Sequence, residues 1–272
     1  PISRDAVPSD GDREGPPEGG VDFFVPEFNG AAGGVGGYNA FFIDLGDSTF
    51  QIDGEYRTSI LIDPPDGRFP SLTDAAKAKR QESAAFFHKN TGDAWWLDLE
   101  AGPYDDMEVR PLAERCLLGF GSTQGPPMLP VMYNNLKQII QTPEHVVILV
   151  EMNHDTRIIP IDNEHGSKDV RRWLGESVGH WEGDTLVVET THFNEHAFIR
   201  NFAPTPRQAL HWAARCTRIP VHTAGYAFTV TDPNTWTRTW GGSLPITTCR
   251  GPVLEDACHA GTSALTYSVA GP

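Results

Sequence analysis

The sequence predicts a mainly β protein, an antiparallel barrel or sandwich with one long helix and an extended N-terminal arm. Apolar segments of strand length follow one another at short spacing after residue 137, and turn-forming Gly, Pro, Asn and Asp residues separate them. No helical pattern alternates with these segments, which argues against a parallel α/β fold. We therefore expect one β-rich domain, residues 38–272, preceded by an arm, residues 1–37.

The arm is rich in Gly, Pro and acidic residues, a composition that cannot bury enough apolar surface to fold alone. It nevertheless contains a small apolar patch formed by Phe23, Phe24, Val25 and Phe28. Such a patch can dock on the chain's own domain or on a neighbouring subunit. Strand addition to an exposed sheet edge is the expected mode of binding to a partner.

Strands are expected at residues 39–45 and 56–62, followed by a rigid turn at 63–68. Thr73 is then expected to cap a helix that runs to about Lys89. The later strands are expected at 137–141, 145–159, 179–193, 210–219, 226–231 and 235–247, with a tight hairpin turn at 181–185.

Residues 145–159 are expected to form a single strand in the middle of the sheet. The segment is apolar on both faces at its start, so we expect it to be covered on both faces. Its alternation places two carboxylates and a guanidinium on one face and His154 on the other. With residues from nearby segments they form a candidate catalytic set: Glu151, Asp155, Arg157, Tyr133 and Glu189.

Two interpretations of this set remain open. A carboxylate pair in an apolar interior can have one raised pKa and transfer protons, as lyases and isomerases require. Alternatively, the carboxylates and Arg157 neutralise one another in a buried structural network. The catalytic roles belong to the first interpretation.

The sequence predicts no metal and no cofactor. His192 and His196 flank Glu195 at a spacing that suits a helix, but they follow a predicted strand. The acidic turns at 63–66 and 162–166 do not match a calcium-binding loop. The sequence contains no nucleophile elbow, P-loop or dinucleotide fingerprint.

The formal net charge of −15 argues against binding to nucleic acid or to anionic membranes. No apolar run approaches the roughly 18 residues of a membrane helix, so no membrane insertion is expected. A first residue other than Met suggests a processed product. The four cysteines lack a CxxC spacing and favour two disulfides in an oxidising compartment, with three possible connectivities. We therefore expect a secreted protein, extracellular or periplasmic.

Several motifs resemble a family of uncharacterised secreted bacterial proteins. They are RCLLGFG at 115–121, YNN at 133–135, QTP at 141–143, EM at 151–152, HD at 154–155, RIIP at 157–160, WLG at 173–175 and WEGDTLVVETT at 181–191. The resemblance extends from about residue 57 to the C-terminus and carries no known activity. It implies that Cys116 pairs with Cys258 and Cys216 with Cys249. The chain departs from the family at Ala260, where a glutamate is common.

Two functions of different class follow. The first is a secreted structural or accessory subunit, which assembles through its arm into a homo-oligomer or a larger complex. The arm lies outside the resemblance, which favours a role particular to this chain. The alternative is a small-molecule lyase or isomerase with a carboxylate and arginine site inside a β-barrel.

Overall fold

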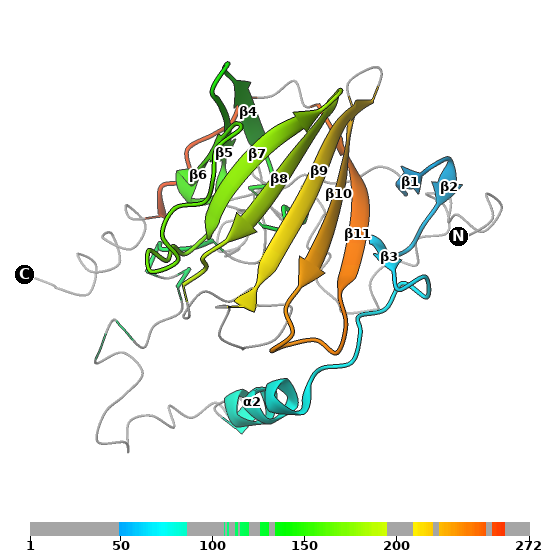
Figure 1. Cartoon of the computed structure of the whole chain (residues 1–272), viewed down its shortest axis with the longest axis vertical. Helices are drawn as coiled ribbons and strands as arrows, with labels where there is room; N and C mark the ends of the chain where they lie inside the picture. Colours follow the sequence, from blue (N-terminus) through cyan, green and yellow to red (C-terminus); the bar gives the residue numbers. More distant parts are fainter. Residues whose placement is uncertain are drawn as a thin grey trace, which may run out of the picture.

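The computed structural model describes residues 49–85, 106, 108, 112–113, 115–119, 126–130, 134–194, 209–219, 223–248 and 252–258. The described part is mainly antiparallel β structure, which confirms the predicted class. Its strands form a six-stranded sheet, a three-stranded sheet and a two-stranded hairpin (Figure 1). The N-terminal arm, with Phe23, Phe24, Val25 and Phe28, and the predicted strand at 39–45 lie outside the described residues.

The first described strands are short. β1 (Gln51–Ile52) and β2 (Glu55–Tyr56) form a hairpin whose turn residues, Asp53 and Gly54, both have positive φ angles of 52° and 80°. An Asp-Gly pair is well suited to this type of turn. The predicted strand at 56–62 is therefore divided between β2 and the separate strand β3 (Leu61–Asp63).

The predicted helix is α2 (Asp74–Ala85), and Thr73 caps it as expected. The Thr73 hydroxyl accepts a hydrogen bond of 3.1 Å from the backbone N–H of Ala76, which would otherwise have no partner in the first turn. Thr73 also donates to the backbone carbonyl of Asn234, so this cap attaches the helix to the loop before β11.

The six-stranded sheet has the order β3-β11-β10-β9-β8-β7, and its neighbouring strands are antiparallel. A two-residue turn at Gly183 and Asp184 joins β7 to β8, as the sequence predicts. The outermost strands, β3 and β7, do not pair with each other, so the sheet is not closed into a barrel. A sandwich describes the arrangement. The remaining bounds are β7 (Glu176–Glu182), β8 (Thr185–Thr191), β9 (His211–Ile219), β10 (Thr223–Thr231) and β11 (Trp240–Thr247).

The three-stranded sheet consists of β4 (Lys137–Gln141), β5 (His145–Val150) and β6 (Thr156–Pro160), with β5 in the centre. An isolated parallel bridge between Ile161 and Gly179 connects it to the edge of the large sheet at β7. The two sheets consequently meet along β6 and β7, and this junction positions the candidate site.

The prediction of one continuous strand over 145–159 is wrong. β5 and β6 are the two arms of a hairpin, joined through a 3-10 turn at Met152–His154. Asn153 and His154 adopt positive φ angles of 59° and 38° in this turn, which interrupts the two-residue alternation. As a result, the buried residues are Val146, Ile148 and Val150 on β5 but Arg157 and Ile159 on β6.

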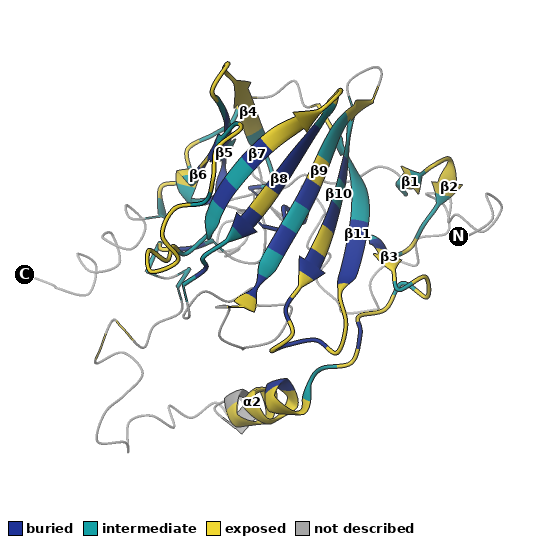
Figure 2. Ribbon diagram, viewed as in Figure 1, coloured by how far each residue is buried: buried dark blue, intermediate teal, exposed yellow. Residues whose placement is uncertain are grey.

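The core lies between the facing sides of the two sheets, where buried positions alternate with exposed ones along the strands (Figure 2). Trp212 of β9 stacks on Phe228 of β10 with ring centroids 4.8 Å apart. Trp240 of β11 packs edge-on against Phe228. These tryptophans are therefore core residues.

A disulfide joins Cys116 to Cys258, across 142 residues of sequence. This confirms one of the two expected bridges and indicates an oxidising compartment. The other expected bridge is wrong at Cys216, which is a free thiol on β9. Cys249 lies outside the described residues.

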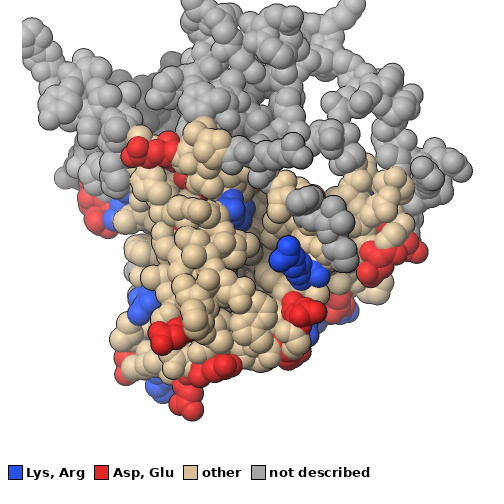
Figure 3. Space-filling model, turned by 90° about the horizontal axis from the view of Figure 1, so that it is seen from above, with Lys and Arg blue, Asp and Glu red and all other residues tan. Residues whose placement is uncertain are grey.

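None of the helices in the described ranges is long and apolar enough to cross a membrane. Asp and Glu side chains lie around the periphery of the surface seen from above, with separate Lys and Arg side chains between them (Figure 3). The acidic composition of the chain is thus visible on this face.

Candidate functional site

A cavity of about 580 Å³ lies where β6 and β7 meet, beneath the loops that precede β7. Charged, aromatic and aliphatic side chains all contribute to its wall. The lining residues are Leu117, Leu118, Asp155, Thr156, Arg157, Ile158, Pro160, Asn163, Glu164, Gly166, Arg172, Trp173, Leu174, Gly175, Glu176, Ser177 and Val178. Cavities of this size with a few converging polar groups are typical of small-molecule sites.

Arg157 is the most buried charged residue of this cavity, with 7% of its surface exposed. β6 directs it into the space between the sheets, where Nε donates to Ser177 Oγ at 2.8 Å and Nη2 donates to Thr190 Oγ1 at 2.7 Å. Ser177 and Thr190 face each other across β7 and β8, and their hydroxyls are 2.9 Å apart. Among the described residues, no carboxylate forms an ion pair with this guanidinium.

The two described groups that act electrostatically on Arg157, Tyr226 and Cys216, are neutral. Burial lowers the pKa of Arg157, while Tyr226 and Cys216 nearby act in the opposite direction. Burial raises the pKa of Cys216 to about 11, and burial also raises the pKa of Tyr226. Both groups are therefore uncharged at neutral pH. The structural network expected from the sequence, in which carboxylates neutralise Arg157, is therefore not formed by these neighbours.

Asp155 lines the same cavity just before β6. Burial is the largest influence on its carboxyl group and raises its pKa, against the hydrogen bond that it accepts from the backbone N–H of Thr156. A carboxyl group with a raised pKa can exchange a proton nearer to neutral pH than an ordinary aspartate.

Glu151 does not share a strand face with Asp155 and Arg157, contrary to the sequence prediction. It precedes the 3-10 turn and is 2% exposed. Its Oε1 accepts a hydrogen bond of 2.9 Å from the backbone N–H of Leu254, and it is not part of the cavity lining. Glu151 therefore helps to hold the C-terminal segment against the β5–β6 turn.

Glu189 is also misplaced in the predicted set. On β8 it alternates with the buried Val188 and Thr190, so its side chain faces outward, 4.0 Å from His211. Period-two alternation separates it from the cavity, because adjacent residues of a strand point to opposite faces. Tyr133 lies outside the described residues. The structure thus brings together two of the five predicted residues, Asp155 and Arg157.

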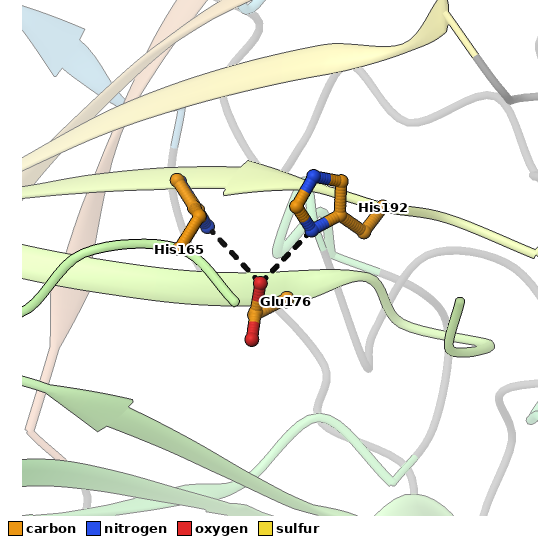
Figure 4. Close-up of side chains that lie close together, drawn as sticks. All are labelled: His165, Glu176 and His192. Carbon is orange, nitrogen blue, oxygen red and sulfur yellow. Dashed lines mark hydrogen bonds and ion pairs between the residues drawn. The ribbon is translucent and has the colours of Figure 1, made fainter. Parts of the chain in front are cut away.

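Two histidines and one glutamate form a cluster, His165, Glu176 and His192 (Figure 4). Of these three residues, Glu176 lines the cavity. His192 Nδ1 is 2.9 Å and His165 Nδ1 is 3.4 Å from the same carboxylate oxygen, Oε2 of Glu176. The potential ligand atoms of the three residues all lie within 4.8 Å of one another. Two imidazoles and a carboxylate form a ligand set that suits zinc or non-haem iron.

The backbone positions each member of this cluster. Glu176 is the first residue of β7, and His192 directly follows the last residue of β8, so the pairing of Glu176 with Thr191 brings the two side chains together. His165 comes from the loop after β6. The neighbouring Gly166 N–H donates to Glu176 Oε2 at 3.0 Å, which fixes the loop to the carboxylate.

Burial acts to raise the pKa of Glu176, but the hydrogen bonds from His192 and Gly166 and the contact with His165 hold it below its ordinary value. The carboxylate is therefore ionised at neutral pH. No Lys or Arg side chain pairs with it within the described residues. The two imidazoles are its side-chain partners.

The sequence contains a partial signal for this cluster. It draws attention to His192 only together with His196, at a spacing that suits a helix, and to the turn at 162–166 only as an acidic turn that does not match a calcium-binding loop. Glu195 and His196 lie outside the described residues. The correct combination requires the β7–β8 register and the return of the 162–166 turn toward β7, neither of which follows from the spacing along the chain.

None of the family models, curated proteins and solved structures with which the chain was compared matches it. Its function is therefore inferred from the residues and geometry of the site.

Proposed function

We propose that the cavity over Arg157 binds a small molecule that carries a carboxylate, and that Asp155 exchanges a proton with the bound molecule. Proton transfer next to a carboxylate belongs to lyase or isomerase chemistry. The observation that carries this proposal is a buried guanidinium in the wall of a 580 Å³ cavity, without a carboxylate partner among the described residues.

The energetics favour an anionic ligand. Arginine remains protonated in proteins, and a buried charge without a counter-charge costs several kcal/mol. Two neutral hydroxyls accept hydrogen bonds from Nε and Nη2, and a guanidinium has five N–H donors, so the described residues do not use all of them. A carboxylate offers both the opposite charge and the planar pair of acceptors that a guanidinium binds most strongly.

The experiment compares wild-type protein with Arg157→Met and with Arg215→Met as a matched control. Arg215 is exposed and paired with Glu182, so its loss leaves the cavity intact. Acetate, succinate and benzoate serve as probes in thermal unfolding. At a concentration of about 100 times Kd, a bound probe stabilises the folded state by about 2.7 kcal/mol.

We expect at least one probe to stabilise the wild type and Arg215→Met, with no stabilisation of Arg157→Met. Methionine of similar length keeps the core filled and removes the buried charge, so this variant stays folded. Equal responses of the wild type and Arg157→Met, or no response of the wild type to any probe, would contradict the proposal.

The role of Asp155 is tested by calorimetry of the same binding in buffers with different ionisation enthalpies. An anion next to Asp155 stabilises its protonated form further, so we expect proton uptake on binding. Asp155→Asn should bind the probe without proton uptake. If the variant takes up as many protons as the wild type, Asp155 is not the group involved.

We also propose, as a second candidate, that the protein is a secreted subunit that assembles through its arm. The support is an apolar surface on one face of the small sheet. Ile140 on its outermost strand β4 is 44% exposed and Ile158 on β6 is 57% exposed, and both pair with Val147 of β5, so they lie on the same face. Ile139, 53% exposed, lies on the opposite face of β4. An outermost strand with apolar side chains is a suitable acceptor for strand addition by the arm of another copy.

Deletion of residues 1–37 is expected to convert an oligomer into a monomer while the β domain stays folded. Light scattering measures the mass, and circular dichroism reports the fold. A change of Ile140 to Lys in the full-length chain should have the same effect, because it places a charge on the proposed acceptor surface. An unchanged mass in both variants would rule out this candidate.

A further inference from the structure

We propose that His165, Glu176 and His192 bind a divalent transition-metal ion, with Zn²⁺ as the first choice. This site is separate from the Arg157 interaction, although Glu176 also lines the cavity. An ion bound there would lie at the edge of the cavity, within reach of its contents. The three residues would act together as a ligand set that the sequence does not reveal.

Two of the three distances between the ligand atoms are close to those of a zinc site, and all three are within 4.8 Å. Ligand atoms about 2.1 Å from a tetrahedral zinc ion lie about 3.4 Å from one another. His165 Nδ1 and Glu176 Oε2 are already 3.4 Å apart. His192 Nδ1 and Glu176 Oε2 are 2.9 Å apart, so they must separate by about half an ångström, a small rotation of either side chain.

The lack of hydrogen-bond partners at the His165 ring also supports a bound ion at this site. Both ring nitrogens of His165 are buried and have no partner with hydrogen-bond geometry in the described part of the chain. Buried polar atoms usually have a partner, and each exception requires an explanation. A metal ion supplies one, because it binds the lone pair of a neutral imidazole.

The chemistry around Glu176 leaves this carboxylate available to an ion. No Lys or Arg within the described residues competes for it. The Gly166 N–H donates to its Oε2 at 3.0 Å and so orients the carboxylate, as outer hydrogen bonds do in metal sites. Three protein ligands leave a fourth tetrahedral position for water or a bound molecule, which is the arrangement of catalytic zinc sites.

The test is calorimetric titration of the full chain with ZnCl₂ after removal of metal by a chelator. We expect one ion per chain with micromolar or stronger affinity. His165→Ala, Glu176→Gln and His192→Ala should each weaken binding at least about tenfold, the lower limit for disturbing even the outer hydrogen bonds of a metal site. Substitution with Co²⁺ should produce the visible absorption of a tetrahedral ion, and Glu176→Gln should remove it.

The matched control is His180→Ala. His180 lies on β7 and contacts the carboxylate of Glu182 at 3.4 Å, and both side chains are about half exposed. Within the described residues, this pair belongs to no group of three potential metal ligands. The variant should therefore bind Zn²⁺ like the wild type.

Absence of saturable Zn²⁺ binding, or equal weakening by His180→Ala, would contradict the proposed site. His165→Ala changes a loop residue and keeps the strands intact, so a folding defect does not obscure its result. Arg157→Met should keep full Zn²⁺ affinity. The metal site and the anion proposal can therefore fail independently.

Discussion

Loss of the disulfide between Cys116 and Cys258 is expected to lower the free energy of unfolding by about 2–5 kcal/mol. The bridge closes a loop of 142 residues, so its removal increases the conformational entropy of the unfolded chain. It also holds the C-terminal segment, whose Leu254 N–H satisfies the buried Glu151 carboxylate. Urea unfolding of the Cys116→Ser, Cys258→Ser double variant measures the effect.

Cys216→Ser is the control for this experiment. Cys216 is a free thiol, and its replacement removes no covalent constraint, so we expect a smaller loss of stability. Peptide mapping without reduction should recover Cys116 linked to Cys258. Recovery of Cys116 bound to another cysteine, or equal stability of the double variant and the wild type, would contradict the structure.

Gly175→Ala is expected to lower the free energy of unfolding by about 2–5 kcal/mol, the sum of a backbone penalty and a packing penalty. Gly175 has a φ of +71°, which costs an alanine about 1–2 kcal/mol. Its new Cβ would lie 2.7 Å from the carbonyl oxygen of Thr191 and 2.9 Å from the ring of Phe193. Relieving such overpacking costs about 1–3 kcal/mol more. Because Glu176 is the next residue, the same change should also weaken Zn²⁺ binding.

Gly183→Ala separates the two contributions. Gly183 also has a positive φ, +60°, but a Cβ there would meet nothing within 4 Å. Only the backbone penalty of about 1–2 kcal/mol should remain, and Zn²⁺ binding should not change. Thermal or urea unfolding of both variants gives the comparison. Equal losses in the two would show that the close packing of Gly175 against Thr191 and Phe193 contributes nothing.

Local sequence patterns predicted much of the strand content. The range 137–141 matches β4, the turn at 181–185 joins β7 to β8, and Thr73 caps α2. These features depend on residues close together in sequence, such as a turn-forming Gly-Asp pair or a hydroxyl three residues before an N–H group. Such short-range preferences can be read without knowledge of the fold.

The strand predicted at 145–159 shows the limit of such patterns. Its two-residue alternation continues through residues 151–155, although the chain reverses there. A periodic pattern gives the face of each side chain only while the strand continues, since a turn changes which residues point inward. For this reason the pattern groups Glu151 with Asp155 and Arg157. It also puts Arg157 and Ile159 on the face opposite Val146, Ile148 and Val150, although all five are buried.

The β class, the acidic character of the chain and the position of Asp155 and Arg157 next to an apolar segment all follow from the amino-acid sequence. Which side chains meet depends on the fold. Pairing of β7 with β8 places Ser177 and Thr190 under Arg157, and the same register brings His192 to Glu176, where the loop after β6 adds His165. The physical reason is that these contacts join residues from separate strands and loops, and their distances depend on strand register and sheet packing, which spacing along the chain does not specify.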